Sequence, residues 1–165
     1  VGEWCRAHSA AEIEAIMLAA EVPVTRAFSI ADIAADPHYA ARADIVTCVT
    51  TSTTPIVKGS WLKPGAHVDL AGAFKPTMRE TDGDVVARPR VYVDTRDVAL
   101  AEAGDLLQAR DEGKFDFTNI QGDLSDLCRG RVQGRMTPSE ITLFKSCGTA
   151  IEDLATAIMV YQKAA

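Results

Sequence analysis

The sequence lacks the features that mark several common classes of protein. No apolar stretch approaches the roughly 20 residues that a membrane helix needs, and the opening residues form neither a basic nor an apolar targeting region. The four cysteines lie far apart, without a CxxC pair or a disulfide framework. The three histidines have no metal-binding spacing. We therefore expect a cytoplasmic protein with reduced thiols, no metal and no membrane partner.

The chain has fewer basic than acidic residues, with 17 Lys and Arg against 23 Asp and Glu. The net charge of −6 and the isoelectric point near 5.0 argue against binding to nucleic acids. The other proportions are ordinary, because hydrophobic residues make up 47% and charged residues 24% of the 165 residues. This length is enough for one domain with a core of its own. No G-x-S-x-G motif is present, so a serine hydrolase has no support.

Short β-branched segments alternate with segments of helical periodicity. Segment 44–50 is apolar without alternation, as in a strand covered on both faces, and Ser9 with Glu12 forms a helix-capping pattern. Such alternation predicts βαβ units and an α/β fold with a Rossmann-like, doubly wound, mostly parallel sheet. Strands are expected at 1–5, 44–50, 67–71, 91–93 and 141–144; helices are expected after Ser9, before Pro37, and at 97–108, 124–128 and 149–161; the remainder of 111–139 is expected to be loop-rich.

Small, hydroxyl-bearing or glycine residues follow four of these strands. In open parallel sheets, ligands bind beyond the carboxyl ends of the strands. Residues of this kind allow a backbone to approach a ligand closely and offer hydrogen-bond donors to it. The sequence therefore predicts a binding crevice formed by the segments 50–52, 71–73, 94–96 and 145–148.

The glycine-rich turn that opens a dinucleotide-binding fold is missing from the sequence. Either the chain binds no dinucleotide, or the turn precedes Val1. A strand followed by a capped helix is typical of the second βα unit of such a fold, which favours the latter. We therefore expect residues 1–148 to form a Rossmann-like domain that lacks its first strand and its glycine-rich turn.

The end of the first expected strand bears on the choice of cofactor. Enzymes that use NAD usually place an acidic residue there to bind the ribose 2′-hydroxyl, whereas this chain has Arg6, with His8 nearby. A guanidinium suits a 2′-phosphate, so the sequence favours NADP over NAD. The alternative is that Arg6 is a solvated surface residue.

Several blocks of sequence resemble the ornithine cyclodeaminase/mu-crystallin family, and together they cover nearly the whole chain. Members of this family are typically homodimers of about twice this length. The resemblance implies that the dimerisation segment, and the catalytic groups that hold the substrate carboxylate, lie upstream of Val1 in a longer protein. It also implies that the helix within 149–165 returns towards that segment. The blocks are 44–50, 54–55, 59–67, 72–80, 92–94, 102–106, 134–135 and 142–155.

One position separates the activities within this family. Ornithine cyclodeaminases carry an Asp where this chain has Phe74, and an aromatic ring cannot accept a proton as a carboxylate does. Segments 68–74 and 78–80 are instead similar to Δ1-pyrroline-2-carboxylate reductases, which reduce a cyclic imino acid to proline with NAD(P)H. The alternatives are a cyclodeaminase that converts ornithine to proline and ammonia with bound NAD, and a non-catalytic mu-crystallin-like ligand-binding protein.

The resemblance also implies a set of cofactor contacts. Lys145 lies either near the substrate carboxylate or at a strand end facing water, and Asp94 either caps a turn or touches a ligand. Arg79 and Glu80 are expected to form a local ion pair, and Cys147 is interpreted as a small buried residue rather than a nucleophile. The implied cofactor contacts are Arg6, Thr50, Asp69, Leu70, Ala71, Gly72, Met78, Ser146 and Cys147.

Overall fold

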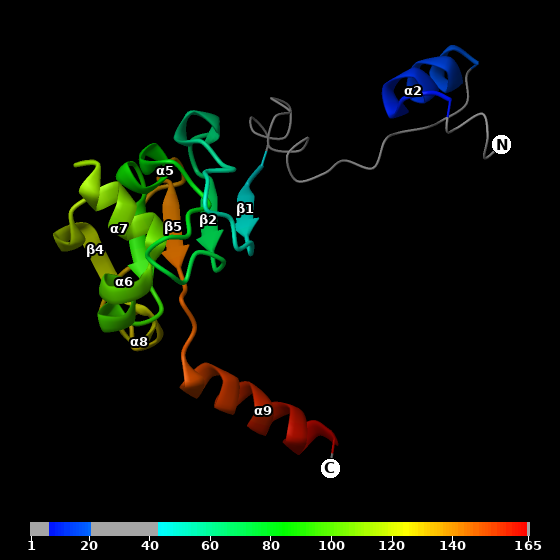
Figure 1. Ribbon diagram of the computed structural model, residues 1–165. Coiled ribbons are helices and arrows are strands. Elements are labelled where there is room, and N and C mark those ends of the chain that lie inside the picture. Colours follow the sequence, from blue (N-terminus) through cyan, green and yellow to red (C-terminus); the bar gives the residue numbers. More distant parts are fainter. Residues whose placement is uncertain (1–6, 21–42, 165) are drawn as a thin grey trace. The chain divides into compact units, whose positions relative to one another are not determined.

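The computed structural model describes residues 7–20 and 43–164 (Figure 1). The chain divides into two compact units, Val1–Ala35 and Asp36–Ala165. The predictions for the strand at 1–5, for Arg6 and for the short helix before Pro37 lie outside the described residues.

In the first unit, helix α2 spans Ala10–Ala19. The backbone N–H of Ser9 donates to the Glu12 carboxylate at 2.7 Å, and the backbone N–H of Glu12 donates to Ser9 Oγ at 3.3 Å. This reciprocal pair is the predicted capping box, which is confirmed.

The second unit contains a sheet whose five described strands are all parallel. The order across the sheet is β1-β2-β5-β3-β4. The last strand in the sequence therefore lies at the centre, between β2 and β3. This arrangement confirms the predicted α/β class with a parallel sheet. The strands are β1 (Ile45–Cys48), β2 (His67–Leu70), β3 (Arg90–Val93), β4 (Ile120–Asp123) and β5 (Thr142–Lys145).

The core forms where the central strands meet the neighbouring helices. Most buried strand residues of the core are aliphatic, and α5 (Gly83–Ala87) and α7 (Gly104–Asp111) add Val85 and Leu106 to the same cluster. Burial of each such side chain stabilises the fold by roughly 1.5–3 kcal/mol. The aliphatic strand residues with no exposed surface are Val68, Leu70, Val91, Val93 and Leu143, and Lys145 of β5 is equally buried.

The helix predicted at 97–108 is divided in the structure, and that prediction was wrong. Helix α6 (Arg96–Glu102) ends before Ala103, whose extended backbone separates it from α7. The break brings Gly104 against another segment of main chain, since a Cβ on Gly104 would lie 2.0 Å from the carbonyl oxygen of Met78. Only glycine allows this approach.

Four short elements were not predicted, namely α5, β4 and the 3₁₀ helices Gly59–Trp61 and Phe117–Asn119. Helix α5 is held by Asp82, whose carboxylate accepts from the backbone N–H of Val85. Strand β4 lies within the stretch that was expected to be loop-rich. The predicted short helix is present as α8 (Leu124–Cys128), and the final helix as α9 (Ala150–Ala164). No described helix is long and apolar enough to cross a membrane.

The apolar residues predicted for the final helix are exposed. In α9, the residues Ile151, Leu154 and Ile158 are 74%, 59% and 47% exposed. That this helix returns towards a dimerisation segment stays a prediction.

Candidate functional site

Four neighbouring strands end level with one another at a single edge of the sheet, which we name the carboxyl edge. Cys48 of β1 pairs with Leu70 of β2, Leu70 with Lys145 of β5, and Lys145 with Val93 of β3. In Figure 1 the arrowheads of β1, β2 and β5 point the same way. The segments that follow these strands, 49–52, 71–73, 146–148 and 94–96, therefore emerge side by side.

A buried carboxylate joins the first two of these segments. Glu80 has no exposed surface. Its Oε1 accepts from the backbone N–H of Thr50 at 2.5 Å, and its Oε2 accepts from that of Gly72 at 2.9 Å. Gly72 is required because a Cβ there would lie 1.8 Å from the carbonyl oxygen of Thr50. The glycine thus allows the main chains after β1 and β2 to pack against each other.

A second buried acid lies behind Glu80. Asp105 Oδ1 accepts from the backbone N–H groups of Glu80 and Thr81 at 2.8 and 2.9 Å, and from the Thr81 hydroxyl at 3.0 Å. Its Oδ2 lies 3.9 Å from Nζ of Lys145, which is an electrostatic contact too long for a hydrogen bond. Burial raises the pKa of Asp105 above its ordinary value, and Lys145 opposes that rise.

Lys145 is part of this buried cluster and does not face water. Its side chain has no exposed surface, and Nζ donates to the carbonyl oxygens of Ser146 at 3.1 Å and Leu70 at 3.4 Å. The interpretation of Lys145 as a solvent-facing lysine was wrong, because the end of β5 lies between β2 and β3 and is covered by α7 through Asp105.

A third carboxylate joins the ends of β3 and β5. Asp94 Oδ2 accepts from the backbone N–H groups of Cys147 and Gly148, both at 2.7 Å, and from the Ser146 hydroxyl at 3.1 Å. Its Oδ1 accepts from the backbone N–H of Thr95 at 2.6 Å. The sequence left open whether Asp94 caps a turn or touches a ligand. In the structure it caps the turn at Thr95 and also holds the neighbouring segment 146–148.

The local ion pair expected between Arg79 and Glu80 is absent, and that prediction was wrong. Arg79 pairs with Glu112 instead, through both terminal nitrogens, while Glu80 turns inward to the backbone donors. This geometry sends one charge outward and the other into the core.

The remaining predicted site residues divide between the carboxyl edge and the core. Thr50 Oγ1 accepts from the backbone N–H of Ser52 at 3.3 Å, and Ala71 donates to the carbonyl of Cys48 at 2.9 Å. Leu70 is fully buried, so only its backbone can serve a ligand. Asp69 lies half-buried within β2, and Met78 lies half-buried on the segment that packs against α7.

The two thiols near this edge are poor nucleophiles. Burial raises the pKa of Cys147 to about 11 and that of Cys48 to about 12. Both thiols are therefore protonated near neutral pH. This agrees with the interpretation of Cys147 as a small, partly buried side chain.

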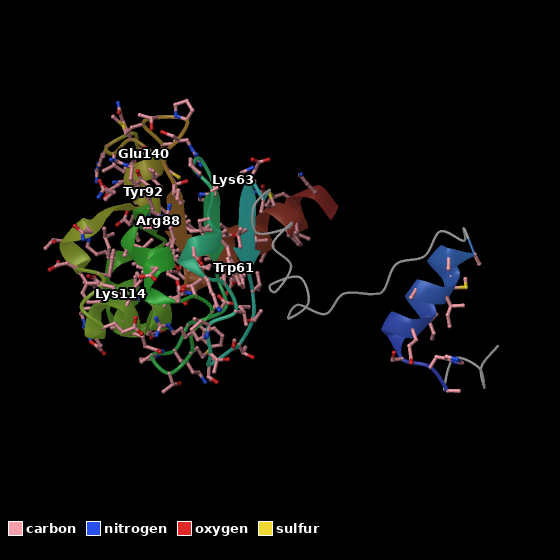
Figure 2. The ribbon with its side chains drawn as sticks, turned by 90° about the horizontal axis from the view of Figure 1, so that it is seen from above. Trp61, Lys63, Arg88, Tyr92, Lys114 and Glu140 are labelled. Carbon is pink, nitrogen blue, oxygen red and sulfur yellow. The ribbon has the colours of Figure 1, made fainter. Side chains whose placement is uncertain are left out.

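A hollow of about 350 Å³ lies at the opposite edge, by the amino ends of β3 and β4. Arg88, Arg90 and Glu140 line it, and Figure 2 shows Arg88 and Glu140 on this side of the molecule together with Tyr92. The two guanidinium groups already serve the fold, because Arg88 donates to the carbonyl of Gly59 and Arg90 to the Tyr92 hydroxyl. Ligands of open parallel sheets bind at the other edge, so we place the candidate site there.

Of the three carboxylates that organise the edge, sequence reasoning singled out Asp94 and missed the roles of Glu80 and Asp105. Asp105 was named only within block 102–106, which resembles the family, and Glu80 was expected to pair with Arg79. A usable signal was the position of Asp105 between Gly104 and Leu106, since an acid beside apolar residues needs several donors; Glu80, between Arg79 and Thr81, carries no such signal. Which donors those are depends on contacts between residues 8 to 54 positions apart.

A parallel α/β sheet with ligand-accessible loops at one carboxyl edge defines the Rossmann-like class of nucleotide-binding folds. The chain belongs to the ornithine cyclodeaminase/mu-crystallin family, whose model matches residues 3–165.

Similar proteins include several reductases. The chain is 41% identical to the Δ1-pyrroline-2-carboxylate reductase of Paracoccus denitrificans over 121 residues, which cover 73% of this chain and 38% of that protein. It is 38% identical to the ketimine reductase mu-crystallin of Mus musculus over 119 residues, covering 72% and 35%. The chain thus spans well under half the length of these relatives.

The fold is likewise similar to that of a solved reductase. The Thermococcus litoralis Δ1-pyrroline-2-carboxylate reductase, solved with NADH and L-proline, superposes with a TM-score of 0.75 at 32% identity. The match covers 92% of this chain and 45% of that one. Reductases of cyclic imines are therefore well represented among the similar proteins.

Proposed function

We propose that the protein containing this chain reduces a cyclic imino acid, such as Δ1-pyrroline-2-carboxylate, to the corresponding cyclic amino acid with NAD(P)H. The observation that carries the proposal is the carboxyl edge itself, with four segments level and side by side. The similarity to reductases of this substrate supports it. Bound NAD(P)H would supply a hydride to the imine carbon, while a proton from solvent ends on the ring nitrogen.

The described part of the edge suits the rings and sugars of a dinucleotide better than its phosphates. Val49 and Phe74 are exposed there, and apolar surface of this kind can pack on flat rings. The backbone N–H groups of Thr50, Gly72 and Cys147 are already bonded to carboxylates. The diphosphate therefore needs donors from elsewhere, in keeping with the glycine-rich turn that we propose to precede these residues.

The substrate carboxylate also needs a cationic partner from elsewhere, because Lys145 is enclosed. We propose that the partner lies upstream of the described residues, in a protein that acts as a homodimer. We further propose that NADP is preferred over NAD, on the strength of Arg6. The test compares the Kd values of NADPH and NADH in the wild-type protein and in an Arg6→Ala variant. The preference for NADPH should shrink in the variant.

Cyclodeaminase chemistry is the second candidate, and Phe74 argues against it. The ring is 38% exposed, at the carboxyl edge two residues after Gly72, with Nζ of Lys75 located 5.8 Å from its centroid. An aromatic ring in this place can neither accept a proton nor orient an amine. None of the residues 71–79, which follow β2, carries a carboxylate that could take the place of the missing Asp.

A pair of assays on the full-length protein separates the candidates. Reduction predicts oxidation of NAD(P)H, followed at 340 nm by its absorbance, on adding Δ1-pyrroline-2-carboxylate. Cyclodeamination predicts ammonia release from ornithine without net change in the nucleotide. A ligand-binding protein without catalysis would show neither, yet its thermal midpoint would still rise with NADPH. Ammonia release without imine reduction would overturn the proposal.

A further inference from the structure

Glu80 holds two segments of the carboxyl edge at once. Both oxygens of its fully buried carboxylate accept backbone N–H groups, one directly after β1 and one directly after β2. Such charge-assisted hydrogen bonds are about twice as strong as neutral ones. The relative position of Thr50 and Gly72 is therefore set by one side chain that belongs to neither strand.

The backbone of Glu80 is itself fixed from two sides. Its carbonyl oxygen accepts from the N–H groups of Ile56 and Val57 at 2.8 and 3.1 Å, and its N–H donates to Asp105. Asp105 in turn faces Lys145, which donates to the carbonyls that end β2 and β5. The chain of contacts from Thr50 to Ser146 thus spans the ends of β1, β2 and β5.

This arrangement is costly if stability alone is considered. The carboxylates of Glu80 and Asp105 are both buried, and the one ammonium group near them in the described structure, that of Lys145, lies beside Asp105 at 3.9 Å; replacing buried ions with well-packed apolar residues is often neutral or stabilising. Burial of charge instead fixes geometry, because each partner has few alternative positions. The geometry fixed here is that of the segments next to the proposed nucleotide site.

We propose that Glu80 is a positioning residue for nucleotide binding, which sets the spacing of the segments after β1 and β2 without touching the cofactor. The inference rests on the proposed function, since it concerns the same site. Glu80 is closed off by Thr50 and Gly72, so its effect reaches a bound nucleotide only through their main chains.

The test compares Glu80→Gln with Thr142→Val in the full-length protein. Gln has the same size, but its amide has one acceptor oxygen, so one of the two backbone donors loses its partner. Thr142 is also buried and polar, at the amino end of β5, where its hydroxyl bonds His67 and Arg135. Its replacement removes buried hydrogen bonds at the opposite edge and serves as the matched control.

We expect Glu80→Gln to raise the Kd of NAD(P)H by roughly tenfold, because binding must then restore a spacing that the bond otherwise sets beforehand, at a cost of about one charge-assisted hydrogen bond. The KM for NAD(P)H should rise by a similar factor, with a smaller change in kcat at saturating cofactor. Amide exchange at Thr50 and Gly72, followed by NMR, should accelerate relative to Val68 within β2. Thr142→Val should lower the thermal midpoint and leave the cofactor Kd within twofold of wild type.

Each outcome decides the matter. Wild-type affinity in Glu80→Gln, or an equal loss of affinity in Thr142→Val, would overturn the positioning role. If Glu80→Gln does not fold, Glu80→Asp keeps the charge but is too short to reach both donors, and the same loss of affinity is expected. A wild-type protein that binds no nucleotide would instead refute the proposed function. In that case, unchanged amide exchange at Thr50 and Gly72 in Glu80→Gln would also refute the role of Glu80 in joining these two segments.

Discussion

Replacing Lys145 with Met tests whether this lysine belongs to the fold or to the substrate site. Met keeps much of the length of the side chain but removes the ammonium group. Asp105 Oδ2 has no hydrogen-bond partner in the described structure, and Lys145 is its cationic neighbour at 3.9 Å. The variant therefore leaves a buried carboxylate without its cationic neighbour, with hydrogen bonds to Oδ1 alone.

The expected loss of stability is large. Removing one member of a buried ion pair costs about 3–5 kcal/mol, and both side chains are fully buried. Burial already raises the pKa of Asp105, while Lys145 lowers it; without Lys145 the pKa rises further. The folded state then binds a proton that the unfolded state has released, so the variant loses stability as the pH rises above about 4.

Urea unfolding at pH 5 and pH 8 measures this loss, with the double variant Lys145→Met/Asp105→Asn as the control. Asn keeps the oxygen that accepts from Glu80 and Thr81 and removes the buried charge, so the double variant should recover part of the stability at pH 8. A single variant as stable as wild type at pH 8, with a raised KM for the imine, would refute this reasoning and place Lys145 at the substrate.

Three further predictions concern single groups. Burial lowers the pKa of His67, so the stability that its neutral form contributes is present above pH 6.5 and lost as the pH falls through the lowered pKa; His67→Gln should reduce this slope in thermal unfolding between pH 5 and 7. Cys147, with a pKa of about 11, should react with iodoacetamide slowly at pH 7.5 and about tenfold faster per pH unit above it, and alkylation faster than that of exposed Cys128 would contradict its burial. Asp94→Asn should weaken the bonds to segment 146–148 by about 1–3 kcal/mol, seen as faster amide exchange there, whereas unchanged exchange would show that this segment is held by other contacts.

The parallel strands could be predicted because their composition is decisive. Segments such as 44–50 and 91–93 are β-branched and apolar without alternation, which is typical of parallel strands. The expected cover on both faces was wrong for β1, because Ile45 and Thr47 are exposed. Strand β4 was not predicted because only Ile120 and Gly122 of its four residues are buried. An edge strand with a single large apolar residue shows little hydrophobic periodicity. The Ser9 cap was predictable because its partners lie three residues apart.

The contacts within the candidate site could not be predicted in the same way. The break at Gly104 exists because the segment ending at Met78 packs against it, and a helical pattern does not reveal such a neighbour. Glu80 bonds a residue 30 positions away, and Lys145 bonds one 75 positions away. The strand order, with β5 between β2 and β3, creates both contacts. The location of the edge followed from the sequence, but the bonds that shape it did not.

The measurement that tests the central claim most directly is hydrogen exchange of the full-length protein with and without saturating NADPH. We predict slower exchange in segments 49–52, 71–79, 94–96 and 146–148, at the carboxyl edge. Segments 63–66 and 88–90, at the opposite edge, should exchange at the same rate in both states. Protection confined to 88–90 and the hollow beside it, with no change at the carboxyl edge, would contradict the account.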